Sequence, residues 1–179
     1  MINEDVIGFL KGVPPFQFLD EKALQVVVSG LSMEYYPKGT IILRQDGPPS
    51  EWLRVIKKGG VKVFITPDKG EDVLIDYRGE GDAFGLLSLV GGDKSRANIV
   101  AVDDTICYLL DKTAVMKLVE SVPAFTEFFL KSFLNKFIDK TYEEMHNKSL
   151  LFGGGDKLLF TTPVGEIAAK NVRRASDSI

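Results

Sequence analysis

The sequence predicts a mainly β fold with flanking helices: a β-roll of the jelly-roll type (a double-stranded β-helix), with short N-terminal helices and a long C-terminal helix. Between positions 32 and 110, short runs rich in β-branched and aromatic residues alternate with turns that contain Gly and Pro, which is typical of a sandwich or barrel. After position 110, apolar residues recur at helical spacing. The composition, 45% hydrophobic and 26% charged over 179 residues, suits one globular domain with a tail.

The N-terminal segment, residues 1–30, is predicted to be helical in two pieces. An apolar run at 6–10 follows a possible cap at Asn3, and it stops before two consecutive prolines because proline cannot continue a helix. Asp20 is a plausible N-cap for a second helix, since apolar residues follow it at helical spacing and Gly30 ends them.

The β-roll is placed at residues 31–110. Its predicted strands are 33–36, 40–43, 52–56, 61–65, 73–77, 98–102 and 105–110. Apolar residues at 61, 63 and 65 alternate with Lys62 and Phe64, which predicts a strand with one buried face. Gly39 and Gly59 fall in the turns between strands, where a left-handed backbone is expected.

Helices are predicted again over residues 111–150. Asp111 is a plausible cap for the first, and Pro123 can open the second at its first turn. The second helix carries a wide apolar stripe at Phe125, Phe128, Phe129, Phe133, Leu134, Phe137, Ile138, Tyr142 and Met145. Either this stripe packs entirely on the roll, or part of it pairs with a second copy of the chain in a homodimer.

Residues 151–179 are interpreted as a linker, marked by three glycines at 153–155, and the beginning of a further unit at 164–168 that the chain does not complete. The net charge of −3 and the pI near 5.3 lack the basic excess that a nucleic-acid surface needs. The start of the chain is acidic and no apolar run approaches membrane-spanning length, which predicts a soluble cytoplasmic protein without a membrane partner.

Signatures of enzymes are incomplete in this sequence. The stretch 92–95 resembles the end of a phosphate-binding P-loop, but Asp93 separates the glycine from the lysine. The stretch 79–84 lacks the third glycine of a dinucleotide fingerprint. One histidine, His146 on a polar helix face, and one cysteine, Cys107 inside an apolar strand, cannot build a zinc site in one chain. We therefore predict that this chain is not an enzyme and holds no metal.

One stretch has the features of an anion site. A glycine turn leads through Phe84 and Gly85 into about one helical turn at 86–89, and Arg96 follows a short loop later. Free amides at a helix start favour an anion, and an arginine can add a bidentate, charge-assisted pair to the same phosphate. From the residues alone, a surface loop with a solvated arginine is the alternative.

The same stretch resembles the phosphate-binding cassette of cyclic-nucleotide-binding domains, the sensor of catabolite activator proteins, protein kinase A regulatory subunits and gated channels. The family pattern Phe-Gly-Glu-Leu-Ala-Leu, then a loop, then Arg-Ala, is matched at Phe84, Gly85, Leu87, Ser88 and Leu89 and at Arg96 and Ala97. The resemblance covers roughly residues 14–148 and implies that the ligand-binding residues are Phe84, Gly85, Leu86, Leu87, Ser88, Arg96, Ala97 and Asn98.

Two positions depart from that family. Leu86 stands where the family has the glutamate that binds the ribose 2′-OH, and Asn98 replaces a small residue. The resemblance thus implies a sensor for cyclic AMP or another small nucleotide-like anion, with weakened cyclic AMP binding.

A second resemblance concerns residues 160–168, which look like the start of a CBS domain. A cyclic-nucleotide-like sensor occurs with CBS and nucleotidyltransferase-like modules in a family of bacterial signalling proteins. This resemblance implies that the chain is the sensor and that its C-terminal helix signals to such downstream domains. A ligand-free structural or dimerisation module of the same fold is the alternative function.

Overall fold

The computed structural model describes residues 2–152, without the side chains of 2–3, 136–137, 140 and 147–152. The elements in chain order are α1 (Ile2–Lys11), η1 (Phe16–Phe18), α2 (Glu21–Ser29), β1 (Ser32–Tyr36), β2 (Ile41–Leu43), β3 (Trp52–Lys58), β4 (Val61–Ile65), β5 (Val73–Arg78), β6 (Ala83–Phe84), α3 (Leu86–Gly91), β7 (Asn98–Ala101), β8 (Thr105–Asp111), α4 (Lys112–Ser121) and α5 (Pro123–Phe152). The chain divides after Phe128 into a first unit that holds the strands and a second unit that begins at Phe129. The predicted linker at 153–155 and the CBS-like stretch lie outside the described residues.

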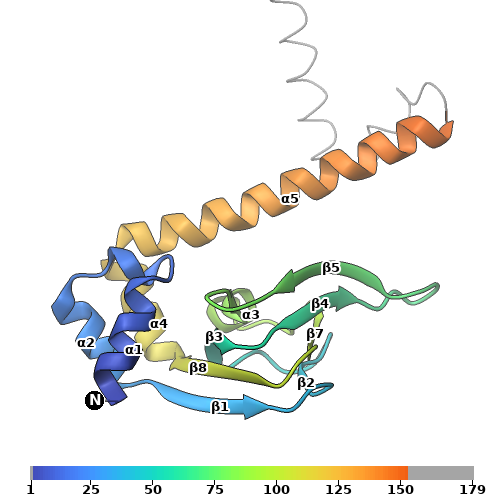
Figure 1. Ribbon diagram of the computed structural model, residues 1–179. Coiled ribbons are helices and arrows are strands. Elements are labelled where there is room, and N and C mark those ends of the chain that lie inside the picture. The colour runs from blue at the N-terminus through green and yellow to red at the C-terminus, as the bar shows by residue number, and fades with distance from the viewer. Residues whose placement is uncertain (1, 153–179) are drawn as a thin grey trace, which may run out of the picture. The chain divides into compact units, whose positions relative to one another are not determined.

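Two four-stranded antiparallel sheets form the roll, with strand orders β1-β8-β3-β6 and β2-β7-β4-β5 (Figure 1). Within the described chain, β4 and β5 are the only consecutive strands that pair with each other. The other connections pass from one sheet to the other, as in a jelly roll. The predicted fold class, a mainly β roll with flanking helices, is confirmed.

Every predicted strand is present, with ends that differ from the prediction by one or two residues. Sequence reasoning missed β6, because two residues are too short to show an alternating pattern. β6 is fixed instead by its partner strand, since Phe84 pairs with Arg54 and Ala83 with Val55. This short pairing carries the chain directly into α3.

The core lies between the two sheets. Its buried members are Tyr36, Ile56, Val61, Val63, Phe84, Ile99, Ala101, Cys107 and Leu109. Cys107 is fully buried and unpaired, and burial raises the pKa of its thiol to about 12. Its predicted role as a small buried hydrophobic residue is confirmed.

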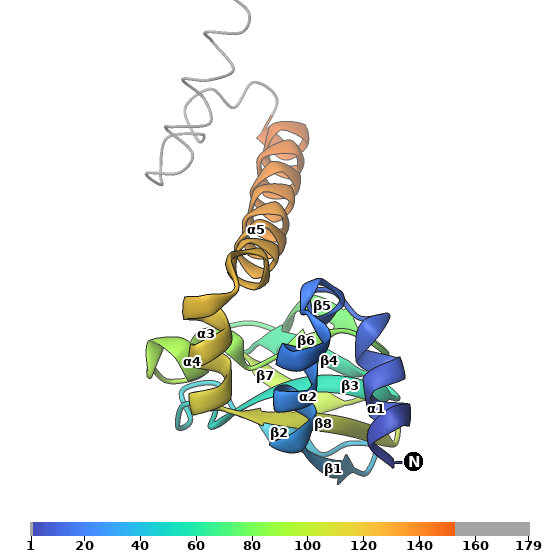
Figure 2. The ribbon, with the colours of Figure 1, turned by 90° about the vertical axis from the view of Figure 1, so that its left-hand side faces the viewer.

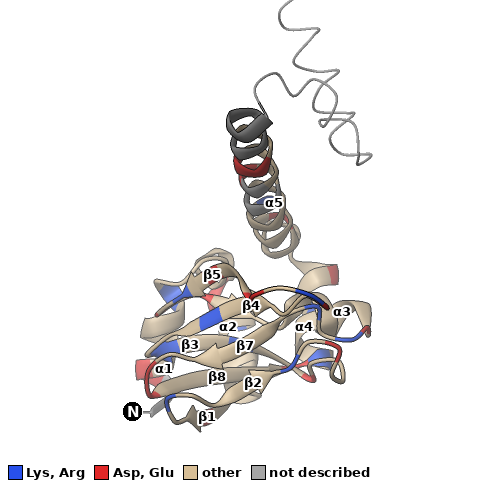
Figure 3. Cartoon of the chain, turned by 90° about the vertical axis from the view of Figure 1, so that its right-hand side faces the viewer, with Lys and Arg blue, Asp and Glu red and all other residues tan. Residues whose placement is uncertain are grey.

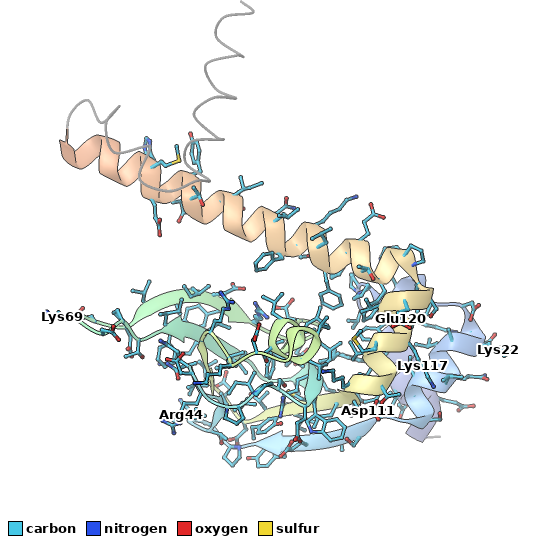
Figure 4. The ribbon with its side chains drawn as sticks, turned by 180° about the vertical axis from the view of Figure 1, so that it is seen from behind. Lys22, Arg44, Lys69, Asp111, Lys117 and Glu120 are labelled. Atoms are coloured by element: carbon cyan, nitrogen blue, oxygen red, sulfur yellow. The ribbon has the colours of Figure 1, made fainter. Side chains whose placement is uncertain are left out.

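Three predicted helix starts are confirmed, two of them by a capping hydrogen bond. Asp20 accepts a hydrogen bond from the amide of Ala23, and Asp111 accepts one from the amide of Ala114, each at 2.7 Å. Pro123 is the first residue of α5. Figure 4 shows Asp111 at the start of α4, with Lys117 and Glu120 further along that helix.

The predicted cap at Asn3 is wrong, because α1 already begins at Ile2 and includes Asn3. Glu4 and Asp5 then lie in the first turn, where acidic side chains stabilise a helix by interacting with the positive end of its dipole. Figures 1 and 2 show α1, α2 and α4 gathered at one end of the roll. The N-terminal helices therefore close the end of the roll from which β8 leads into α4.

The apolar stripe of α5 has two environments. Phe125 is fully buried in the first unit, with its ring edge-on to that of Phe16 at 5.7 Å between centroids. In the second unit, large apolar side chains are exposed at Leu130, Phe133, Leu134, Ile138 and Tyr142. The beginning of the stripe thus belongs to the packing of the first unit, and the exposed ridge starts beyond it.

The described surface shows neither a membrane span nor a metal cluster. No helix among residues 2–152 is long and apolar enough to cross a membrane. The same part of the chain contains no group of three or more His, Cys, Asp and Glu side chains that could hold a metal. On the face of the roll in Figure 3, basic and acidic residues are interspersed.

Candidate anion site

Gly85 forms the sharp turn between β6 and α3. Its φ of +90° lies in the left-handed region, and a Cβ atom there would come within 2.9 Å of the Trp52 carbonyl oxygen and 3.0 Å of Ser50 Oγ. Glycine is therefore required at this position both for conformation and for space. The turn sets the direction of α3, whose first amides have no acceptor within the helix.

The side chains of the first turn of α3 differ in exposure. Leu86 is half-buried and Leu87 is 63% exposed. Ser88 is half-buried, and its Oγ accepts a hydrogen bond from the amide of Ser50 at 3.0 Å. The position of the Ser88 hydroxyl is thus fixed by the loop before β3.

Arg96 is exposed, at the end of the loop between α3 and β7. Its guanidinium makes no hydrogen bond or ion pair with any residue in the described part of the chain. Neither Glu80 nor Asp82, the acidic residues of the turn before β6, forms an ion pair with it. Asp82 accepts a hydrogen bond from the amide of Gly79 at 2.8 Å. Arg96 is thus available to a ligand from solvent.

The residues next to Arg96 are structural. Ser95 is buried and donates to the Ala97 carbonyl at 2.8 Å. Asn98 Oδ1 accepts the Gln45 amide at 3.0 Å, and its Nδ2 donates to Thr66 Oγ1 at 3.1 Å. Asn98 therefore ties the start of β7 to two other segments, and both ends of its amide are already used.

Phe84 and Ala97, also predicted as ligand-binding, contribute to the core. Phe84 is 1% exposed, and Ala97 packs against the core cluster as a half-buried residue. Gly85 to Ser88 and Arg96 are the predicted residues that are neither part of the core nor used as a tie between segments. The ligand-binding roles of all eight residues stay predictions.

Sequence reasoning missed a hydrogen-bonded network of four side chains that reaches the α3 turn through Ser50. Arg54 is 9% exposed; its Nε donates to the Tyr36 hydroxyl at 2.8 Å and its Nη1 to Ser50 Oγ at 2.9 Å. Tyr36 donates in turn to a carboxylate oxygen of Glu34 at 2.6 Å. Burial, with a smaller contribution from Glu34 and an opposing one from Arg54, raises the pKa of Tyr36 to about 12. A buried arginine inside a strand carries no sequence pattern that would have identified it.

A groove of about 400 Å³ lies nearby, lined by Pro48, Pro49, Glu51, Leu89, Lys112 and their neighbours Ser50 and Gly92. None of the predicted ligand-binding residues lines it. We therefore assign the candidate site to the α3 turn and Arg96 and not to this groove.

Two packed four-stranded sheets, with a short helix and an exposed arginine between β6 and β7, define a jelly-roll domain with a candidate anion site. Residues 33–122, about half of the chain, match the family model of the cyclic nucleotide-binding domain, and the chain belongs to that family. This domain is a regulatory, non-catalytic module, and the kinases to which the chain is similar are matched only over their regulatory parts.

Three relatives show the extent of the similarity. The chain is 33% identical over 119 residues to cGMP-dependent protein kinase isozyme 1 of Drosophila melanogaster, covering 65% of this chain and 15% of that protein. The catabolite activator protein of Thermus thermophilus has a TM-score of 0.62 at 25% identity, with 75% of this chain and 62% of that chain covered.

The third relative is a regulatory subunit of a cAMP-independent protein kinase A from Trypanosoma brucei, in the form of a mutant bound to cAMP. It has a TM-score of 0.57 at 25% identity and covers 72% of this chain and 51% of that chain. The chain thus spans a small part of its kinase relative and half to two thirds of these solved chains.

Proposed function

We propose that this domain is a sensor that binds a small nucleotide-like anion at the amides of Gly85 to Ser88 and at Arg96. The observation that carries the proposal is the exposed and unpaired guanidinium of Arg96, which follows a fixed helix start within a cyclic nucleotide-binding fold. A guanidinium and several amides directed at one phosphate form charge-assisted hydrogen bonds that a neutral loop cannot offer. In this proposal the bound state is transmitted through α5 to downstream domains of the CBS and nucleotidyltransferase-like kind, in a cytoplasmic protein.

Cyclic AMP is a poor ligand in this proposal. The carboxylate that would accept the ribose 2′-OH is replaced by the half-buried Leu86, which removes water from that hydroxyl without offering an acceptor. In this proposal Arg96 and the nearby amides still bind the phosphate, as in the family pattern, and Leu86 changes how the ribose is recognised.

Titration calorimetry tests the anion site with cyclic AMP and cyclic GMP at millimolar concentrations. We expect weak binding, above the micromolar range, and a loss of at least about 10-fold in affinity for Arg96→Ala, because a charge-assisted hydrogen bond is worth roughly 1.5–3 kcal/mol. Lys22→Ala is the matched control; it removes an exposed positive charge from α2, at the helical end of the molecule labelled in Figure 4. Equal losses for both variants, or undiminished binding by Arg96→Ala, would contradict the proposal.

A homodimer through α5 is a further part of the proposal. The exposed ridge of Leu130, Phe133, Leu134, Ile138 and Tyr142 continues along one helix at three- and four-residue spacing, which suits a helix–helix seam. A ligand-free dimerisation module is the second candidate function, and this ridge favours it.

Sedimentation equilibrium at micromolar concentration should give a dimer for the natural sequence and a monomer for Leu134→Glu, because a buried unpaired charge opposes an apolar seam. Val26→Glu, on the exposed face of α2, is the control and should leave the dimer intact. A monomeric natural sequence would disprove dimerisation through this helix.

A further inference from the structure

One loop, between β2 and β3, contacts both halves of the candidate site. The amide of Asp46 donates to the Ser95 carbonyl at 2.7 Å, and the amide of Ser95 donates to the Gly47 carbonyl at 3.3 Å. Further along the same loop, the amide of Ser50 donates to Ser88 Oγ at 3.0 Å. The distance between the α3 turn and the Arg96 segment is therefore set by the length and shape of this loop.

Ser50 is the point at which the loop supports the α3 turn. It is 5% exposed, and its hydroxyl donates to the Trp52 carbonyl at 2.7 Å. A Cβ atom on Gly85 would lie 3.0 Å from Ser50 Oγ, so the turn is packed directly on this hydroxyl. Ser50 therefore contacts the α3 turn twice, through its hydroxyl at Gly85 and through its amide at Ser88.

Ser50 is itself held by Arg54. The guanidinium donates to Ser50 Oγ and to the Tyr36 hydroxyl, and it has no carboxylate within ion-pair distance among the described residues. A buried charge held by neutral oxygens is costly unless its hydrogen bonds are kept. Displacing Ser50 would remove one hydrogen bond from the buried guanidinium of Arg54. The free-energy cost of that loss holds the Ser50 hydroxyl in its position.

We infer that Ser50, supported by the buried Arg54, is a positioning residue that fixes the α3 turn relative to Arg96. This inference rests on the proposed anion site. A support that holds two recognition elements in register contributes to affinity without touching the ligand. Ser50 acts through Gly85 and Ser88 on one side, and through the Asp46–Gly47 turn on the other.

The test compares Ser50→Ala with the natural sequence by amide NMR and by titration with cyclic AMP and cyclic GMP. Without ligand, Ser50→Ala should shift the amide signals of 86–88 and also those of 95–98. Affinity for whichever nucleotide binds should fall roughly 2- to 10-fold, the range that one lost hydrogen bond produces. Thr105→Val is the matched control, because the Thr105 hydroxyl is also buried but bonds to Gly60 and Asp103, and not to the α3 turn or the Arg96 segment.

The outcomes separate this inference from the proposed function. If the natural sequence binds neither nucleotide, the proposed function fails, and the amide signals alone decide the positioning role. If Ser50→Ala binds like the natural sequence, or shifts only the amides of 48–54, the positioning role is overturned. If Ser50→Ala does not fold, Ser88→Ala serves instead: it should shift the amides of 48–51 and 95–98, and shifts confined to α3 overturn the inference.

Discussion

Replacing Leu86 by Glu is expected to strengthen cyclic AMP binding by about 10- to 150-fold. The new carboxylate would accept a hydrogen bond from the ribose 2′-OH, and a hydrogen bond to a charged group is worth roughly 1.5–3 kcal/mol. Leu86 is half-buried as the first residue of α3, directly after the rigid turn at Gly85. The replacement therefore changes a side chain whose backbone is already held in place. Titration calorimetry on the natural sequence and on Leu86→Glu measures the gain.

Two further variants test whether the gain in affinity comes from a hydrogen bond to the ribose in the predicted site. Adding Arg96→Ala to Leu86→Glu should abolish the gain, because ribose recognition requires that the phosphate is bound first in the same site. Leu87→Glu is the matched control: it places a carboxylate one residue along the helix, at a position that is 63% exposed. An unchanged affinity for Leu86→Glu would show that the pocket is blocked elsewhere, and the ligand-free module would then be the better account.

Replacing Gly59 by Val is expected to lower the free energy of unfolding by about 3 kcal/mol. Gly59 has a φ of +89°, and a Cβ atom there would lie 2.4 Å from the Asp104 carbonyl oxygen and 2.7 Å from Thr105 Oγ1. The left-handed conformation costs a non-glycine residue roughly 1–2 kcal/mol, and overpacking against backbone adds about 1–3 kcal/mol. Urea unfolding with a two-state fit measures the loss.

Gly39 supplies the control for this prediction. Its φ is also +89°, but no other atom lies within 4 Å of the place that a Cβ atom would take there. Gly39→Val should therefore cost about 1 kcal/mol, the conformational part alone. Equal losses at the two positions would show that the turn at Gly59 relaxes away from Asp104 and Thr105.

Much of the fold follows from local sequence. The turns and the alternating or apolar runs predicted every strand except β6, and side-chain caps at Asp20 and Asp111 predicted two helix starts. These signals are local because strand pattern, turn chemistry and capping each depend on a few neighbouring residues. The first helix was misjudged at Asn3 since the competing start at Ile2 lacks a distinctive cap.

The sequence predicts Gly85 and Arg96 as site residues because a turn glycine and a lone arginine at that spacing form a motif within one stretch of chain, and their binding role stays a prediction. The packing of Phe84 and Ala97 in the core, and the hydrogen bonds of Asn98 to other segments, could not be predicted from the sequence. Their partners come from strands and loops far away in sequence, and a one-dimensional pattern does not show them.

By itself the sequence determined the class of fold and the order of its strands and helices apart from β6, and it predicts the stretch for the anion site. Only the tertiary structure decided that Arg96 stays unpaired, and that Ser50 and Arg54 support the α3 turn. The physical reason is that exposure and buried hydrogen bonding are set by which segments meet in space. Ser50 meets Ser88 across 38 positions of chain, a contact that exists only once β6 has paired with β3 and brought α3 beside the loop before β3.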